Sequence, residues 1–391
     1  MTHADRPPPF PAPAPAGAGA RAVTAGSWQA VVDGFALWSV GRRSGVGTYT
    51  EQLLAALGQR QDGTVWALAT TGVTLPPGVG RLAVRRRAAR PRLEVIEQST
   101  LLPVDLLRLR PAGSVFHNPG YHPPPLIRGP WVQTLLDVIP LVLDHPELSA
   151  LKARWRRFGP RYARADAVIA ISGHAARQGI RVLGLDPARV TVAPLAADPS
   201  FGPSGRGPAE PPYLLVVGEY SRRKGFDCAF AVSDDLAERG YPHRLKVAGR
   251  IHPWARDELL ARRAGAAHPE RIELCGYVAN LVELYQGASA YLMTSRFEGF
   301  GLPVLEAMAC GTPVVAFANS ALTELVGDAG ILVDDGDAVA MGAQVRRLID
   351  DTGWAEEWRG RGIDRAAGFT WSRTAAIHAE VYRQVAEAAG R

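Results

Sequence analysis

The chain has 391 residues, of which 47% are hydrophobic and 21% charged, a composition typical of a globular protein with one or two sizeable cores. Its three cysteines lack the spacing of a disulfide framework or a zinc site, so we expect a protein of a reducing cytoplasm. No apolar stretch approaches the roughly 20 residues of a membrane-spanning helix, and we expect no such span.

The net charge of +6 comes from the first half, because residues 1–200 hold 23 Lys and Arg against 13 Asp and Glu. The sequence has no groove-reading helix, RNA-binding signature or interleaving of basic and aromatic residues, so we do not expect nucleic acid as a partner. An anionic membrane surface or an anionic lipid-linked phosphate fits the basic half better. A solvated basic surface without a partner is the alternative.

Residues 1–27 are rich in Pro, Ala and Gly, and we predict a disordered tail there. The first strand is predicted at residues 28–33, and Gly45 and Gly47 then open a helix. The GVGTYT motif around them is an incomplete dinucleotide fingerprint, because it lacks a third glycine and lies well after the strand. It supports cofactor binding only weakly, and we expect no cofactor.

Short β-like runs alternate with helix-forming segments through the rest of the first half, which indicates a doubly wound parallel sheet. Aromatic residues between 151 and 164 recur at helical spacing among arginines, until Gly159 and Pro160 interrupt the pattern. Such a pattern is typical of a core-facing helix, and a helix on a membrane surface is the alternative. The β-like runs are residues 65–69, 82–85, 115–117, 132–136 and 167–171.

Two of these runs lead into polar side chains, His117 and Asp137. Ligands of open parallel sheets bind beyond the carboxyl ends of the strands, so we expect both residues near a ligand. His122 follows His117 in a loop that prolines make rigid. A structural role for both histidines is the alternative.

Gly and Pro at residues 204–212 predict a linker between an N-terminal domain, residues 28–203, and a second domain, residues 213–370. The second domain begins with a strand that ends at Gly218, and its next loop, EYSRRKG, carries Arg222, Arg223 and Lys224. Basic groups at a strand end, directly before a helix, can neutralise a diphosphate. A solvated charge run is the alternative.

Residues 291–318 predict a strand, a glycine-rich turn, a short helix and a second strand. Glu298 lies in the turn and Glu306 is predicted in the first turn of the helix. Gly299 lets the backbone approach a ligand, and the free N–H groups at residues 300–302 would bind a phosphate. The carboxylates would accept hydrogen bonds from hydroxyls, so the combination indicates a nucleotide sugar. Otherwise Glu306 only complements the helix dipole and Glu298 is solvated.

The segment SRFEGFGLPVLEAMACGTPVVA resembles the signature of the family-4 retaining glycosyltransferases, which have the GT-B fold. The resemblance implies an α/β protein of two Rossmann-like domains that face each other across a cleft, the nucleotide sugar in the second and the acceptor in the first. A C-terminal helix at residues 371–389 would pack back on the first domain. The closest correspondence lies between residues 213 and 335.

By this resemblance, Glu298, Lys224 and Arg223 are the catalytic residues, and Glu306 holds the donor ribose. Lys224 matches a family lysine. Glu219 stands where the family often has an arginine, for which Arg222 or Arg223 would substitute, and Leu136 stands where it has a histidine. Other expected donor-binding residues are Phe300, Gly301, Leu302, Gly299, Gly218, Arg222, Gly249, Arg250 and Tyr277, and those on the acceptor side are Gly45, Gly47, His117 and Asp137.

The implied reaction moves mannose, glucose or rhamnose, with retention of configuration, to a saccharide, a lipid-linked or a small-molecule acceptor, as in polysaccharide biosynthesis. We expect a cytoplasmic enzyme, with peripheral membrane contact through its basic half. Residues 335–337, Asp-Gly-Asp, predict a turn that caps a helix, so we expect no catalytic metal. A nucleotide-sugar epimerase and a non-catalytic nucleotide-sugar-binding protein are the alternatives.

Overall fold

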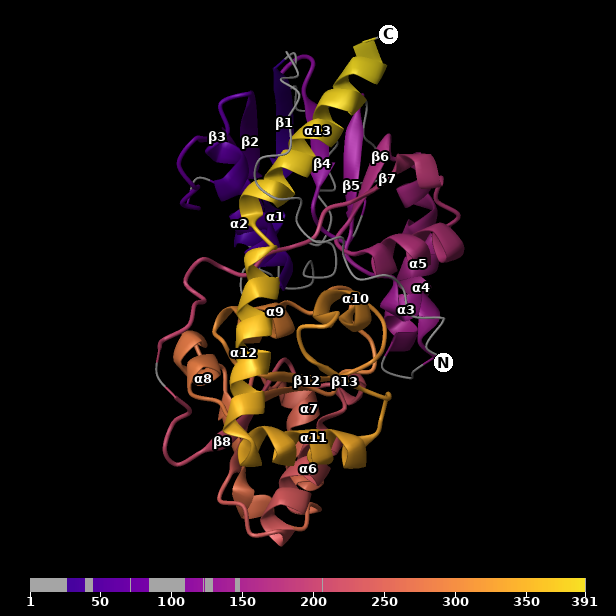
Figure 1. Cartoon of the computed structure of the whole chain (residues 1–391). Helices are drawn as coiled ribbons and strands as arrows, with labels where there is room; N and C mark the ends of the chain where they lie inside the picture. Colours follow the sequence, from indigo (N-terminus) through magenta and orange to yellow (C-terminus); the bar gives the residue numbers. More distant parts are fainter. Residues whose placement is uncertain are drawn as a thin grey trace. The chain divides into compact units, whose positions relative to one another are not determined.

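The computed structural model describes residues 27–38, 45–70, 72–83, 110–121, 123, 129–144, 148–205 and 207–390 (Figure 1). They form two compact units that divide between Leu195 and Ala196, and the chain from Thr370 onward belongs with the first. We call them the N-terminal unit and the C-terminal unit. The division comes before the predicted linker, whose described residues belong to the C-terminal unit. The predicted N-terminal tail lies outside the described residues, apart from Ser27.

In the described residues, the N-terminal unit contains a parallel sheet of seven strands in the order β3-β2-β1-β4-β5-β6-β7. The sequence predicts this sheet because most of its strands are short apolar runs, of which β4, β5 and β6 are buried on both faces. One predicted run is displaced, since β3 begins at Val79, and residues 84 and 85 of that run lie outside the described part. The strands are β1 Trp28–Asp33, β2 Gly63–Ala69, β3 Val79–Ala83, β4 Val115–Asn118, β5 Trp131–Leu135, β6 Ala167–Ala170 and β7 Val190–Val192.

The described helices of this unit before α13 each lie between two consecutive strands of the chain. Ser172 caps the start of α5, because its hydroxyl accepts a hydrogen bond of 2.9 Å from the N–H of Ala175. In the aromatic segment, Trp155 of α4 and Tyr162 of the turn that follows are buried and stack with ring centroids 5.4 Å apart, so these two side chains face the core. The helices are α1 Phe35–Trp38, α2 Gly45–Gly58, α3 Ile139–Val142, α4 Ser149–Phe158, α5 Gly173–Leu183 and α13 Trp371–Gly390.

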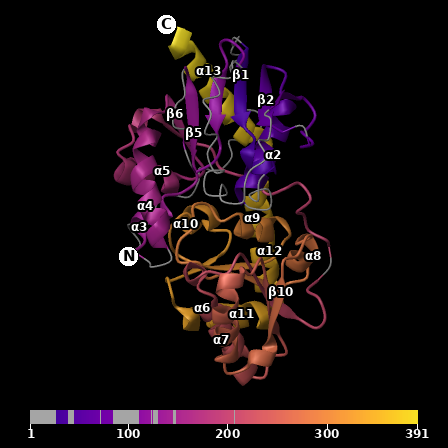
Figure 2. The same ribbon diagram turned by 180° about the vertical axis from the view of Figure 1, so that it is seen from behind.

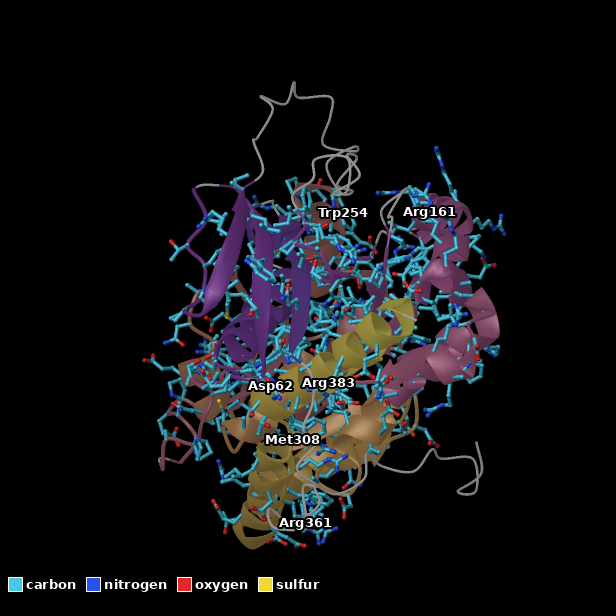
Figure 3. The ribbon with its side chains drawn as sticks, turned by 90° about the horizontal axis from the view of Figure 1, so that it is seen from above. Asp62, Arg161, Trp254, Met308, Arg361 and Arg383 are labelled. Atoms are coloured by element: carbon cyan, nitrogen blue, oxygen red, sulfur yellow. The ribbon has the colours of Figure 1, made fainter. Side chains whose placement is uncertain are left out.

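The last helix, α13, packs against α2 and β1 of the N-terminal unit (Figure 1). Tyr382 lies 5.7 Å from Trp28 between ring centroids, and Arg383 reaches Asp62 at 3.3 Å between Nη2 and Oδ2 (Figure 3). A buried hydrogen-bonded network also joins the helix to the sheet, through His117 and His378. The N-terminal unit is therefore built from two separate parts of the chain, with the C-terminal unit between them in the sequence.

In the described residues, the C-terminal unit has a parallel sheet of six strands in the order β10-β9-β8-β11-β12-β13. The order reverses between β8 and β11, and such switch points are where open parallel sheets bind ligands. The strands are β8 Tyr213–Val217, β9 Arg244–Ala248, β10 Ile272–Gly276, β11 Ala290–Met293, β12 Val314–Phe317 and β13 Ile331–Val333. Two parallel sheets with alternating helices confirm the predicted α/β class.

Helices cover this second sheet, with α6 and α11 side by side (Figure 2) and α12 beside α9 (Figure 1). The apolar faces of α6, α7 and α11 and the strands make a core, which includes Phe226, Leu259 and Val345. The helices are α6 Phe226–Glu238, α7 Pro253–Ala264, α8 Val282–Gln286, α9 Leu302–Ala309, α10 Leu322–Val326, α11 Ala338–Asp350 and α12 Thr352–Ala367.

All three cysteines are free thiols, as their spacing predicts. Among the helices of the described ranges, none combines the length and the apolarity that crossing a bilayer requires.

Candidate functional site

The ends of β8 and β9 meet beside the switch point of the C-terminal sheet. The N–H of Gly218 donates to the carbonyl of Ala248 at 2.9 Å, and the N–H of Gly249 donates to that of Gly276 at 2.8 Å. Gly249 has a φ of +151°, and a Cβ there would lie 2.0 Å from the carbonyl oxygen of Gly218. The backbone therefore requires glycine at 249, as a close approach of two strand ends does.

Lys224, Arg223 and Glu298 form a cluster at the switch point, which we call the Glu298 cluster. Nζ of Lys224 lies 2.7 Å and Nη1 of Arg223 lies 3.3 Å from the same oxygen, Oε1 of Glu298. The cations come from the short 3₁₀ turn Arg222–Lys224 after β8, and the carboxylate comes from the loop after β11. The sequence predicts all three residues, and the fold brings them together because β8 and β11 are neighbours.

The cluster is largely removed from water, since 14% of the Lys224 side chain and 12% of the Glu298 side chain are exposed. Burial by itself would raise the pKa of the Glu298 carboxyl. The charge of Lys224, then that of Arg223, and hydrogen bonds from Lys224 and Ser295 outweigh burial and lower the pKa to about 2. Glu298 is therefore an anion at neutral pH that holds two cations in place.

Helix α9 begins directly after this cluster, at Leu302. Within the described part of the chain, no protein acceptor binds the N–H groups of Phe300, Gly301 and Leu302, as the start of a helix leaves them. Gly301 has a φ of +106°, and a Cβ there would lie 2.9 Å from Cδ2 of Leu322. A glycine is thus needed for the turn that aims these donors. Together with Lys224 they form a suitable environment for an anion.

Glu306 lies in the second turn of α9 and not in the predicted first turn, because the helix begins at Leu302. Interaction with the helix dipole at the N-terminus therefore does not account for a carboxylate at this position. The hydroxyl of Tyr285 donates to Oε2 of Glu306 at 2.9 Å. Burial raises the pKa of Glu306 to about 7; the Tyr285 hydrogen bond opposes this shift and the nearby charge of Asp198 adds to it.

The remaining predicted donor residues lie at the ends of β8, β9 and β10. Nε of Arg222 pairs with Glu258 of α7 at 2.8 Å, so Arg222 lies away from the Glu298 cluster. Glu219 faces the next strand end instead, with Arg250 at 3.9 Å and His252 at 3.3 Å from its carboxylate. Tyr277 follows β10 and is 54% exposed. These side chains are accessible for a ligand, and their expected contact with the base stays a prediction.

The predicted acceptor residues belong to the N-terminal unit and are mostly buried there. His117 is fully buried, with Nε2 2.8 Å from the Thr134 hydroxyl and Nδ1 2.7 Å from the Tyr382 hydroxyl. Contact with an acceptor does not fit this position, because both ring nitrogens already bind protein groups. The Tyr49 hydroxyl bridges Thr134 and His378 at 2.9 Å each, which extends the network to α13.

Asp137 is largely buried and organises the backbone after β5. Its carboxylate accepts from the Tyr121 hydroxyl at 2.7 Å and from the N–H of Ile139 at 3.0 Å. Gly45 and Gly47 belong to the first turn of α2, where Gly45 is exposed and Gly47 is buried. Leu136, at the position of the family histidine, is 5% exposed.

Sequence reasoning missed Tyr285 and Ser320. The hydroxyl of Ser320 accepts from the N–H of Glu298 at 2.9 Å, and its φ of +45° is unusual for a residue other than glycine. Local sequence patterns do not predict these contacts, because each partner lies about twenty residues from its glutamate in the sequence.

Asp337 caps α11 with a hydrogen bond of 2.8 Å from the N–H of Ala340, which confirms the predicted turn at residues 335–337. No group of three or more His, Cys, Asp or Glu side chains in the described ranges has the arrangement of a metal site.

Residues 211–351 match the family model of the glycosyl transferases group 1. The chain is 29% identical over 275 residues to O-antigen chain mannosyltransferase B of Escherichia coli, a match that covers 66% of this chain. The match spans 65% of that relative, slightly less than two thirds of its length.

Two solved structures share the fold. Sucrose-phosphate synthase from Thermosynechococcus elongatus has a TM-score of 0.72 and 21% identity, with 92% of this chain and 100% of that chain covered. HepE from Anabaena, in complex with UDP and glucose, has a TM-score of 0.66 and 16% identity, with coverage of 90% and 98%. These likenesses show that the chain has the GT-B fold.

Proposed function

We propose that this chain, whose residues 211–351 match the family model of the glycosyl transferases group 1, transfers a hexose from a nucleoside-diphosphate sugar to a hydroxyl group. The observation that carries the proposal is the Glu298 cluster. It joins two cations and a buried carboxylate at the switch point of the C-terminal sheet, directly before the free N–H groups of α9.

The donor diphosphate would bind between Lys224 and the N-terminus of α9. Three N–H groups, at Phe300, Gly301 and Leu302, lack protein acceptors in the described chain and would donate to phosphate oxygens. Glu298 repels a phosphate but accepts hydrogen bonds from hydroxyls, so its partner would be the sugar. Glu306, which lies deeper in α9, would accept from the ribose hydroxyls.

We further propose retention of configuration by attack on the face from which the diphosphate leaves. The bond between the anomeric carbon and the phosphate oxygen breaks, the bond to the acceptor oxygen forms, and a donor phosphate oxygen takes the acceptor proton. Lys224 and Arg223 would stabilise the charge that develops on the departing diphosphate. In this scheme no protein side chain is a nucleophile.

The expected sugars are mannose, glucose and rhamnose, and the expected acceptors are saccharides, lipid-linked sugars or small molecules. The name of the E. coli relative supports a mannosyl group and a polysaccharide product, and the HepE complex supports a nucleoside diphosphate. A cytoplasmic site of action remains part of this proposal.

The test is an incubation of the purified chain with UDP-, GDP-, ADP- and dTDP-sugars and a mixture of acceptors, followed by mass spectrometry of the products. We expect a glycosylated acceptor and free nucleoside diphosphate from one donor. Glu298→Gln, which keeps the shape of the side chain, should abolish the product while it preserves nucleotide affinity. A changed nucleotide sugar without any acceptor product would instead identify an epimerase and overturn the proposal.

The basic surface of α4 and the turn that follows it supports contact with an anionic membrane. Six Lys and Arg lie between residues 152 and 164 without an acidic residue among them, and Leu151 beside them is exposed. Figure 3 shows Arg161 at this surface. Each cation near an anionic leaflet contributes about 1 kcal/mol, so binding should weaken steeply with salt.

Vesicle flotation tests this contact, with phosphatidylglycerol vesicles compared with phosphatidylcholine vesicles. We expect binding to the anionic vesicles only, and a loss of binding in the Arg156→Glu, Arg157→Glu variant. If the wild-type and variant proteins float equally with the anionic vesicles, this surface is not the site of membrane contact.

A further inference from the structure

Two buried tyrosines lie behind the carboxylates of the candidate site, Tyr285 on α8 and Tyr291 on β11. Both are fully buried, and their ring centroids are 5.6 Å apart. They differ in their hydroxyl groups. The Tyr285 hydroxyl donates to Oε2 of Glu306 at 2.9 Å, whereas the Tyr291 hydroxyl has no hydrogen-bond partner in the described chain.

The fold fixes Tyr285 on several sides. Its N–H donates to the carbonyl of Leu281 at 3.0 Å, and its carbonyl accepts from the Thr312 hydroxyl at 2.5 Å. The Phe201 ring packs edge-on against it at 5.8 Å between centroids. A phenol held in this way has no space to turn, so its hydroxyl specifies one orientation of the Glu306 carboxylate.

We propose that Tyr285 is a positioning residue, which holds the Glu306 carboxylate oriented and hydrogen-bonded to receive the ribose hydroxyls of a bound nucleotide. The inference rests on the proposed function, in which Glu306 accepts those hydroxyls. A carboxylate side chain in a helix has several rotamers, and one that is already fixed loses less freedom when a ligand binds.

The surroundings of Glu306 explain why a hydrogen-bond donor is needed there. Burial raises the pKa of Glu306 to about 7, and Asp198 adds to the rise. A protonated carboxyl is a poorer acceptor for hydroxyls, so nucleotide affinity should increase as pH rises through this value. The Tyr285 hydrogen bond favours the anion, so its removal should move the affinity curve to higher pH.

Other groups face Glu306 from the neighbouring elements. Besides burial, the charge of Glu306 raises the pKa of Tyr291 on β11 and that of Cys310, which follows the end of α9. Tyr285 is the residue in the described chain that hydrogen-bonds directly to the Glu306 side chain.

The neighbouring tyrosine provides a matched control. Tyr285→Phe and Tyr291→Phe each remove one hydroxyl from an equally buried ring, but only the first removes a hydrogen bond to Glu306. A general effect on packing should appear in both variants, and a positioning effect in one.

The experiment is calorimetric titration of the full chain with UDP, GDP, ADP and dTDP between pH 6 and pH 8.5. For the best ligand of the wild type, we expect Tyr285→Phe to weaken binding about fivefold at pH 7 and to move the midpoint of the pH profile upward. We expect Tyr291→Phe to match the wild type. In a Glu306→Gln background, Tyr285→Phe should have no further effect on the pH profile.

The outcomes separate this inference from the function on which it rests. If the wild type binds none of the four nucleotides at any pH, the proposed function fails. If the wild type binds one of them and Tyr285→Phe has the same affinity and pH profile, only the positioning role of Tyr285 is overturned. An equal loss of nucleotide affinity in both tyrosine variants would also overturn the positioning role, because such a loss would indicate an effect on packing alone.

Discussion

Replacement of Lys224 by methionine tests the Glu298 cluster most sharply, because it keeps the length of the side chain and removes the charge. In this variant Arg223, at 3.3 Å, is left as the cation beside a carboxylate that is only 12% exposed. The lowering of the Glu298 pKa from 4.5 to about 2 corresponds to about 3 kcal/mol of stabilisation of the anion at neutral pH.

Lys224 supplies the larger share of the charge effect, so Lys224→Met should lower the free energy of unfolding by about 2 kcal/mol at pH 7. Glu298 has a lower pKa in the folded state than in the unfolded state. The stabilisation is therefore fully present above pH 4.5 and is lost as pH falls towards 2. Removal of both charges, in Lys224→Met with Glu298→Gln, should restore part of the loss.

The assay is urea unfolding of the full chain, followed by tryptophan fluorescence, for both single variants and the double variant. We expect a coupling energy of about 1–2 kcal/mol between the two sites. Arg222→Met is the matched control, since Arg222 is half exposed and pairs with Glu258 at the surface, where such a pair contributes about 1 kcal/mol or less. Effects of Lys224 and Glu298 that simply add would refute the reasoning.

Three further predictions concern the scaffold. Burial lowers the pKa of His378 to about 4, so this residue binds its proton more readily in the unfolded chain below pH 6.5, and its contribution to the free energy of unfolding should fall by about 3 kcal/mol between pH 7.5 and pH 4; in urea unfolding, His378→Gln should remove this contribution from the pH dependence of the wild type. Gly249→Ala should cost more than about 2 kcal/mol, because its Cβ would meet a carbonyl oxygen at 2.0 Å; an unchanged melting temperature would contradict this close approach of the strand ends. Ser172→Ala should cost about 1 kcal/mol through loss of the α5 cap, whereas Ser172→Thr, which keeps a hydroxyl acceptor, should cost less.

The sequence predicts the sheets well, because short runs of Val, Leu and Ala between helix-forming segments are typical of the buried strands of a parallel sheet. β1 has the expected bounds, and most of the other predicted strands lie within one or two residues of the strands in the structure. The meeting of Lys224 with Glu298 also follows from the sequence, since both come after strands that flank a switch point. Local pattern and the topology of parallel sheets are sufficient for these features.

Long-range polar contacts cannot be predicted in the same way. His117 binds Tyr382, 265 residues later, and the sequence around either residue gives no sign of the other. Tyr285 resembles any apolar helix residue until the fold places its hydroxyl at Glu306. The shift of Glu306 to the second turn of α9 is a smaller error, which arises because the start of a helix is weakly encoded.

The most direct test of the central claim is a thermal-shift panel of GDP, UDP, dTDP, ADP and NAD with the purified chain. A ligand at a hundred times its dissociation constant adds about 2.7 kcal/mol of stability to the unit that binds it. The account predicts a clear rise in melting temperature with one nucleoside diphosphate, and a smaller rise with Glu306→Gln. A rise with NAD alone, or none with any of the five, would contradict the assignment of a nucleotide-sugar site at Glu298 and Glu306.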